Sequence, residues 1–262
     1  MSSEWRTDGC CGNDRGDARE ETRDPVAGSP VVKRTMKARK AHSLIGQVYD
    51  RRNLRRAWER VKRNKGAGGV DGVTIARFDE NLDRYLDVLH QQLKDGRYRP
   101  RPVKRVEIEK PGTTKKRPLG IPTVMDRVCQ QALVQVLEPI FEPTFREASF
   151  GYRPGRSAHG AMRRIWRQLE QAEWVVDGDI SDFFGSLSHE LLVDLVADRV
   201  ADGKVLSLIR SMLTAGALVD GVFESAVAGT PQGGVATAPT QSQTSSLSGR
   251  FAGRREGVGR DV

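Results

Sequence analysis

Stripes of apolar residues at helical spacing constrain this chain more than any other feature of its sequence. Apolar side chains recur every three or four positions, as they do on the buried face of an amphipathic helix. The stripes run through residues 54–61, 78–93, 124–140, 165–169, 191–200 and 205–213. Between the second and third stripes, residues 103–121 alternate apolar with charged side chains around Pro111 and Gly112, which predicts a β-hairpin. Helices mixed with a few strands, without a regular strand–helix alternation, predict an α+β fold.

The charge balance indicates a polyanionic partner. The 262 residues contain 43 Lys and Arg against 34 Asp and Glu, a formal net charge of +9. A surplus of this size is typical of proteins that bind RNA, DNA or an anionic surface, although a merely basic surface explains it as well. No run approaches the roughly 18 apolar residues that a membrane span requires, so we expect no membrane partner.

The cysteines and the first residues predict a cytoplasmic protein. Cys10, Cys11 and Cys129 have no zinc-binding spacing, and an odd number suits no disulfide framework, so a reducing compartment is the simplest interpretation. The first residues lack the apolar stretch of a secretory signal. Residues 1–40 are polar, which predicts a disordered tail, and the basic run at its end is either a solvated arm or a phosphate contact. We expect order to begin at Leu44.

Residues 174–184, WVVDGDISDFF, have the clearest strand pattern and end in acidic residues. Asp177 and Asp179 should face the same side, because side chains alternate along a strand. Carboxylates so placed suit Mg²⁺, which takes one or two of them and completes its shell with water and phosphate oxygens. In an alternative interpretation, both aspartates only cap the turn that follows.

Two further segments suggest contacts with a phosphorylated substrate. Lys110, Lys115, Lys116 and Arg117 cluster around the predicted hairpin turn, where cations can neutralise a triphosphate. Exposed turns are also basic simply for solubility. Residues 229–234, GTPQGG, combine a proline that fixes the backbone, glycines that permit close approach of a ligand, and a glutamine amide. Alone, this segment predicts only a turn.

Two other patterns carry no catalytic prediction. Residues 65–72, KGAGGVDG, are glycine-rich, but they lack the Gly-Lys-Ser/Thr ending of a phosphate-binding P-loop and do not follow a strand. This excludes the P-loop NTPases. The histidines are scattered without metal-ligand spacing, so we assign no catalytic role to His42, His90, His159 and His189.

Taken in order, these segments resemble the reverse transcriptases encoded by group II introns. The matching segments are AHSLIGQVYDRRNLRRAWERVKRNKGAGGVDGVTI, KKRPLGIPTVMDRVCQQALVQVLEPIFEP, SFGYRPGRSAHGA, WVVDGDISDFF and GTPQGG. They keep the order of the family and together span about residues 41–234. Retron, diversity-generating and CRISPR-associated reverse transcriptases share the palm, but the YRPGRSAH and LGIP segments favour the group II intron type.

The resemblance implies an RNA-directed DNA polymerase with a right-hand fold. Residues 41–172 would form helical fingers with a β-hairpin, and residues 173–234 a partial palm with an incomplete antiparallel sheet and no thumb. Residues 1–40 and 235–262 would be disordered tails, the second with an aberrant sequence. The implied reaction is template-directed nucleotidyl transfer by a two-metal mechanism with Mg²⁺. The implied partners are an RNA template, intron RNA, a DNA primer and deoxynucleoside triphosphates.

The family's motifs also imply roles for individual residues around the reacting nucleotide. Asp179 matches the aspartate that binds the catalytic metals, assisted by the carbonyl of Ile180. Phe183, rather than Phe184, matches the aromatic residue that lies under the nucleotide sugar and excludes a 2′-hydroxyl. Gln232 matches the glutamine that packs near the incoming base pair.

Basic residues complete the implied site. Lys110 and Arg117 match the cations of the fingers hairpin that grip the triphosphate. The spacing there is one residue longer than in the family, so Lys116 could substitute. The segment YRPGRSAH resembles a family-specific insertion near the template, which makes Arg153 and Arg156 candidate phosphate contacts.

The chain departs from the family after Gln232. The 262 residues contain no Asp-Asp dipeptide, whereas the family places a Tyr-Ala-Asp-Asp motif on a later hairpin. Residues 250–262 resemble the segment that precedes this motif. We therefore expect an N-terminal fragment, truncated before Tyr-Ala-Asp-Asp and inactive alone. The alternatives are a catalytically dead, RNA-binding remnant of a maturase and a pseudogene product without a stable fold.

Overall fold

The computed structural model describes residues 40–109, 116–170, 172, 174, 175, 178, 185–226 and 229. All of them belong to one of the two units of the chain, residues 38–262. Each predicted apolar stripe coincides with one helix, except the stripe at 78–93. The helices are α1 (Ile45–Val48), α2 (Arg51–Asn64), α3 (Ile75–Glu80), α4 (Leu82–Lys94), α5 (Val124–Phe141), α6 (Ala158–Leu169), α7 (His189–Ala197) and α8 (Gly203–Leu213), with a 3₁₀ turn at Glu142–Thr144.

The stripe at 78–93 predicts one continuous helix, and this prediction is wrong. The helix breaks at Asn81, which has φ −119° and ψ 28° and separates α3 from α4. The Asn81 side chain donates to the carbonyl of Arg77 at 3.3 Å. Asparagine side chains compete with helix hydrogen bonds in this way. Because Phe78 lies before the break, α3 can turn its ring into the core independently of α4.

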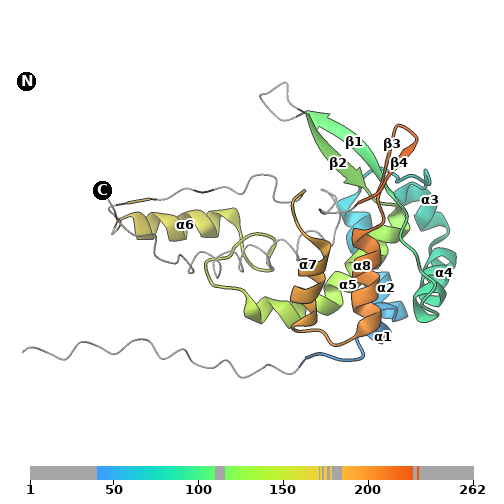
Figure 1. Cartoon of the computed structure of the whole chain (residues 1–262), viewed down its shortest axis with the longest axis horizontal. Coiled ribbons are helices and arrows are strands. Elements are labelled where there is room, and N and C mark those ends of the chain that lie inside the picture. The colour runs from blue at the N-terminus through green and yellow to red at the C-terminus, as the bar shows by residue number, and fades with distance from the viewer. Residues whose placement is uncertain are drawn as a thin grey trace, which may run out of the picture. The chain divides into compact units, whose positions relative to one another are not determined.

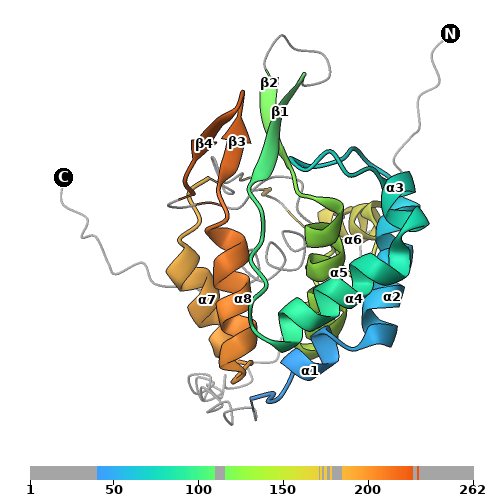
Figure 2. The same cartoon turned by 90° about the vertical axis from the view of Figure 1, so that its right-hand side faces the viewer.

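Helices α1, α2 and α4 pack against α5 to form the main core (Figure 2). The apolar stripe of α2 is buried there, including Leu54, Ala57 and Trp58. Rings extend this packing, since Phe78 stacks on Trp58 at 4.8 Å and on Tyr85 at 4.5 Å between ring centroids. Full burial of one large apolar side chain contributes about 1.5–3 kcal/mol, so the stripes that predicted the helices also hold them together.

The sheet has the strand order β2-β1-β3-β4 (Figure 1). Strands β1 (Val103–Glu109) and β2 (Lys116–Ile121) form the predicted antiparallel hairpin. The strands β3 (Ala217–Val219) and β4 (Val222–Glu224) form a second antiparallel pair, and β3 runs parallel to the start of β1. The described sheet is therefore mixed. The expected antiparallel palm sheet involves residues 174–184, most of which lie outside the described residues.

The connection between α7 and α8 is hydrogen-bonded to the beginning of the described chain. Asp202 caps the first turn of α8 and also accepts a hydrogen bond from the backbone nitrogen of Ile45 at 2.9 Å. Ala41 exchanges backbone hydrogen bonds of 2.8 Å with Arg199 and Ala201. The contacts of Ala41 lie three residues before Leu44, where the sequence predicted that order begins.

Helix α6 differs from the others because it buries no residue within the described part of the chain. Its apolar stripe, Met162, Ile165, Trp166 and Leu169, is exposed. Within the described residues, no helix is both long and apolar enough to cross a bilayer.

Candidate nucleic-acid interface

The hairpin of β1 and β2 carries the cations that the sequence predicts for triphosphate binding. Lys110 lies outside the described residues, and the structure describes only the backbone of Arg117, which pairs with Ile108 in the ladder. Lys116 places its ammonium 3.4 Å from the carboxylate of Glu107. This ion pair is exposed and therefore weak, so a phosphate could replace Glu107 as the partner of Lys116.

A buried hydrogen-bond network fixes the base of the hairpin to α5. Thr123 caps α5 by accepting from the backbone of Asp126, and its hydroxyl donates to that carboxylate at 2.6 Å. The hydroxyl of Tyr98 and the backbone nitrogen of Arg101 donate to the same carboxylate. Burial raises the pKa of Asp126 above its ordinary value, although these hydrogen bonds oppose the rise. The network sets the direction in which β1 leaves the core.

The glycine-rich segment at 65–72 packs against the same end of α5. The guanidinium of Arg127 donates to the carbonyls of Lys65 at 3.3 Å and Ala67 at 2.6 Å. A Cβ on Gly69 would lie 2.6 Å from the Cα of Thr123, so only glycine fits there. The segment therefore packs closely against the base of the hairpin.

Sequence reasoning missed Arg127, which is buried on α5 among both apolar and polar side chains. Its Nε is a buried nitrogen without a hydrogen-bond partner among the described residues. An arginine in an apolar helix stripe next to a glycine-rich loop is a usable signal, because a buried guanidinium needs carbonyl or carboxylate partners. The pairing of Tyr98 with Asp126 has no such signal, since 28 positions separate the two residues.

The two arginines of the YRPGRSAH segment have different surroundings. Arg153 is only 6% exposed, and its Nη2 lies 2.7 Å from Glu142. Its Nη1 donates to the carbonyls of Arg146 at 2.8 Å and Ser149 at 2.9 Å. This geometry argues against the expected phosphate contact at Arg153, because its donors already hold the loop together. Arg156 makes one carbonyl bond and lies over the Phe150 ring, so it is the better candidate.

The residues expected around the reacting nucleotide lie outside the described part of the chain. These are Asp179, Ile180, Phe183 and Gln232, together with Asp177 and Phe184. The described neighbours show how the GTPQGG segment begins: Gly229 donates to the carbonyl of Leu187 at 2.9 Å, and its own carbonyl lies 2.6 Å from Nε2 of His189. His189 thus holds the backbone of Gly229 at the start of α7. Among the described residues, no group of three or more His, Cys, Asp or Glu could hold a metal ion.

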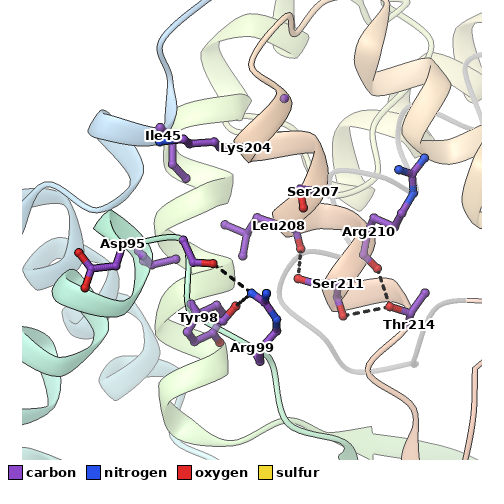
Figure 3. A pocket seen from close by; sticks show the side chains of 13 residues that line it. Ile45, Asp95, Tyr98, Arg99, Lys204, Ser207, Leu208, Arg210, Ser211 and Thr214 are labelled. Carbon is purple, nitrogen blue, oxygen red and sulfur yellow. Dashed lines mark hydrogen bonds between the residues drawn. The ribbon is translucent and has the colours of Figure 1, made fainter.

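A hollow of about 510 Å³ lies between α8 and the connection from α4 to β1 (Figure 3). Arg99, Lys204 and Arg210 contribute its cations and Asp95 its carboxylate. Arg99 donates to the carbonyls of Gly96 and Tyr98, and Asp95 pairs with Arg97. The hollow is basic, but its lining contains no paired carboxylates or nucleophile–base pair for catalysis.

Comparison with known proteins identifies the family. The family model described as reverse transcriptase (RNA-dependent DNA polymerase) matches residues 108–245, more than half of the chain. The chain belongs to the reverse transcriptase family. Its match begins within the hairpin and continues past the GTPQGG segment, so it covers the segments that carry the resemblance from the hairpin onward.

Similarity to two curated relatives places this chain in the group II intron type of the family. It is 39% identical over 179 residues to the group II intron-encoded protein LtrA of Lactococcus lactis subsp. cremoris, covering 68% of this chain and 30% of LtrA. It is 40% identical over 179 residues to protein YkfC of Escherichia coli (strain K12), covering 66% of this chain and 47% of YkfC. The predicted relationship to group II intron reverse transcriptases and maturases is confirmed, and the chain spans less than half the length of these two relatives.

A solved structure supports the fold. One chain of a partial Cas6-RT-Cas1–Cas2 complex superimposes with a TM-score of 0.54, at 20% identity, over 79% of this chain and 34% of that chain. The mixed helix-and-sheet reverse transcriptase fold expected from the sequence is therefore confirmed. The division into fingers and partial palm, at residues 41–172 and 173–234, stays a prediction.

Proposed function

We propose that this chain forms the fingers and the first part of the palm of a group II intron-encoded RNA-directed DNA polymerase. The observation that carries the proposal is the family match across residues 108–245, with the hairpin, the WVVDGDISDFF segment and GTPQGG in family order. The surplus of nine positive charges suits the proposed partners, which are the RNA template, intron RNA and the DNA primer.

In this proposal the basic hairpin binds the deoxynucleoside triphosphate. Lys110 and Arg117 contact the phosphates, and Lys116 is the alternative cation that the longer spacing allows. Neutralising the triphosphate oxygens is the main electrostatic requirement of phosphoryl transfer. The network of Tyr98, Thr123 and Asp126 supports this role, because it anchors the base of this hairpin to α5.

The reacting end of the nucleotide would be held by residues after α6. Asp179 is the proposed ligand of the catalytic Mg²⁺, with the backbone oxygen of Ile180 beside it. Phe183 lies under the sugar and Gln232 near the incoming base pair. Magnesium would supply charge stabilisation for the primer oxygen and the leaving pyrophosphate. The contact of Gly229 with Leu187 and His189 supports this arrangement, since it tethers the GTPQGG segment to the start of α7.

We further propose that a polypeptide of these 262 residues binds RNA but does not extend a primer by itself. Two magnesium ions need several converging carboxylates, and the sequence contains no Asp-Asp dipeptide to join Asp179. This feature favours the alternative function, an RNA-binding remnant of a maturase, for the polypeptide in isolation. The buried core supports a folded unit over an unstructured product.

Primer extension tests both parts of the proposal. The purified polypeptide and its Asp179→Ala variant are incubated with Mg²⁺, nucleotides and a DNA primer annealed to an RNA template, and hybrid binding is measured on the same samples. We expect salt-sensitive binding by both and extension by neither. Extension by the wild type that Asp179→Ala abolishes would overturn the proposed inactivity and support the role of Asp179. Absence of binding would overturn the RNA-binding function.

A further inference from the structure

Helix α2 carries two parallel stripes of basic residues with different surroundings. The first stripe consists of Arg51, Arg55 and Lys62, and the second, which we call the arginine stripe, of Arg52, Arg56, Arg60 and Arg63. Both lie outside the buried face of the helix, and all seven side chains are exposed. Because they share one helix, a difference between the stripes reflects what surrounds each one.

The first stripe faces acidic residues on the neighbouring helices. The guanidinium of Arg51 lies 2.7 Å from Asp87, and that of Arg55 lies 2.6 Å from Asp83. The ammonium of Lys62 lies 2.7 Å from Asp79. The three carboxylates are four residues apart along α3 and α4, and each one pairs with a different cation of the first stripe. This side of α2 is an internal helix–helix contact.

The arginine stripe forms no ion pair within the described part of the chain. Its members are four, four and three positions apart, so their guanidinium groups follow one another up the helix at about 5–6 Å per turn. Two carboxylates accompany it: Glu59 lies at its edge, and Asp50 accepts from the backbone nitrogens of Arg52 and Asn53 as the cap of α2. Like charges at this spacing repel one another, and a polyanion would relieve the repulsion.

A groove of about 580 Å³ adjoins the stripe, and Arg56 belongs to both. One part of its lining is apolar and includes Leu44, Val136 and Ile140. The polar part includes Gln47, Asp50, Asn53 and Gln135.

The amides of the groove are only partly used inside the protein. The Asn53 nitrogen donates to the carbonyls of Val48 and Ala132, and the Gln135 nitrogen donates to Asn53. The side-chain oxygen of Gln135 and the side-chain amide of Gln47 make no hydrogen bond to the described residues. Both groups are therefore available to a ligand. A groove with apolar walls and two amide groups can take a flat heterocycle and bond its edge.

We propose that the arginine stripe and this groove bind a single-stranded segment of RNA. The stripe holds successive phosphates, and the groove takes one unstacked base against Gln47 and Gln135. The identity of the partner as RNA rests on the proposed function. A bilayer fits this surface poorly, because the apolar residues of α2, including Leu54 and Trp58, are buried and cannot insert. A duplex fits poorly as well, because its bases are already paired and stacked.

Two matched triple variants test the stripe in the full chain. The first carries Arg52→Gln, Arg56→Gln and Arg60→Gln, and the second carries Arg51→Gln, Arg55→Gln and Lys62→Gln. Both lose three positive charges from the same helix. Binding of a labelled uridine homopolymer is measured across a salt series, and the thermal midpoint is measured for each protein.

We expect the first variant to bind roughly tenfold more weakly, and its logarithmic salt slope to fall by about 0.7 for each lost phosphate contact. Its thermal midpoint should equal or slightly exceed that of the wild type, because the stripe loses no ion pair among the described residues and its mutual repulsion falls. The second variant should bind within about twofold of the wild type but melt earlier, since it loses three ion pairs. Equal weakening in both variants would overturn the proposed role of the arginine stripe, because net charge alone would then explain the binding.

The groove is tested with a strand that has the same phosphates but no bases. The wild type should bind the uridine strand more tightly than an abasic strand, and a Gln47→Ala, Gln135→Ala double variant should lose that preference. Equal binding of both strands by the wild type would rule out the base contact. If the wild type binds no RNA even at low salt, the proposed function fails together with this surface. If the wild type binds RNA but both triple variants lose the same amount of affinity, the proposed function stands and only the proposed binding surface is wrong.

Discussion

The hydroxyl of Tyr98 donates a hydrogen bond to the carboxylate of Asp126 in the interior, where both side chains are at most 5% exposed. The pair joins the segment that leads into β1 to the first turn of α5. Burial raises the pKa of both groups above their ordinary values. Removing the hydroxyl in Tyr98→Phe should therefore lower the free energy of unfolding by about 1–3 kcal/mol, measured by urea denaturation at neutral pH. An unchanged free energy would show that the bond does not hold the hairpin base.

Asp126 should make the stability depend on pH. Its pKa is raised in the folded state above the ordinary 3.8, so the folded chain holds the proton more tightly than the unfolded chain. The stabilisation from this group is present below 3.8 and is lost as the pH rises through the raised pKa. The difference in unfolding free energy between the wild type and Asp126→Asn should shrink across that window. Parallel pH curves for the two proteins would contradict this assignment.

Asp202 should have the opposite pH dependence. Burial alone would raise its pKa, but hydrogen bonds from backbone nitrogens, including those of Ile45 and Val205, outweigh burial and lower the pKa below 3.8. Its stabilisation is therefore present above 3.8 and is lost as the pH falls through the lowered value.

Two variants separate the charge of Asp202 from its capping role. Asp202→Ala should destabilise the chain by about 1–3 kcal/mol at neutral pH, because the cap of α8 and the bond to Ile45 both disappear. Asp202→Asn keeps an acceptor oxygen, so it should retain much of the capping stabilisation. It should lose the part of the stabilisation that depends on pH. Denaturation from pH 3.8 downward distinguishes them, and equal acid sensitivity in the wild type and Asp202→Asn would refute the lowered pKa.

Gly69 should tolerate no side chain. An alanine Cβ would meet the backbone of Thr123 at 2.6 Å, and overpacking of this kind typically destabilises by about 1–3 kcal/mol. Gly203→Ala is the control, because a Cβ there meets nothing within 4 Å at the start of α8. The control should match the wild type or exceed it by up to about 1 kcal/mol. Thermal unfolding of both variants checks the prediction, and an equal effect of the two would contradict the close approach of the glycine-rich loop.

Arg153 and Arg156 should separate into a stability residue and a binding residue. Arg153→Gln breaks the pair with Glu142 and should destabilise the chain by about 1–3 kcal/mol, less than a fully buried pair because Glu142 is partly exposed. Arg156→Gln should leave the melting midpoint nearly unchanged and weaken RNA binding, lowering the salt slope by about 0.7 if it contacts one phosphate. A loss of binding without loss of stability in Arg153→Gln would reverse the assignment.

Local sequence patterns predicted the elements well where the chain follows its own periodicity. The hairpin at 103–121 and the helix at 124–140 follow directly from alternation and from three- and four-residue spacing, which depend on neighbours along the chain. The break at Asn81 escaped this reasoning, because the apolar stripe continues across it. There the side chain of Asn81 donates to the carbonyl of Arg77, in competition with the backbone hydrogen bonds of a continuous helix.

The sequence by itself determined the family, the type and order of most elements, and the residues expected at the nucleotide, since each of these depends on residue type and local spacing. Only the tertiary structure decided which charges are already paired. Arg153 looks in the sequence like any basic loop residue, yet packing buries it against Glu142. Arg51 and Arg52 are adjacent in the chain, yet α2 turns one toward Asp87 and leaves the other without an ionic partner among the described residues. The interaction between two charges falls with distance, so the role of a charged side chain depends on the groups within a few ångströms of it. Those groups come from distant parts of the chain.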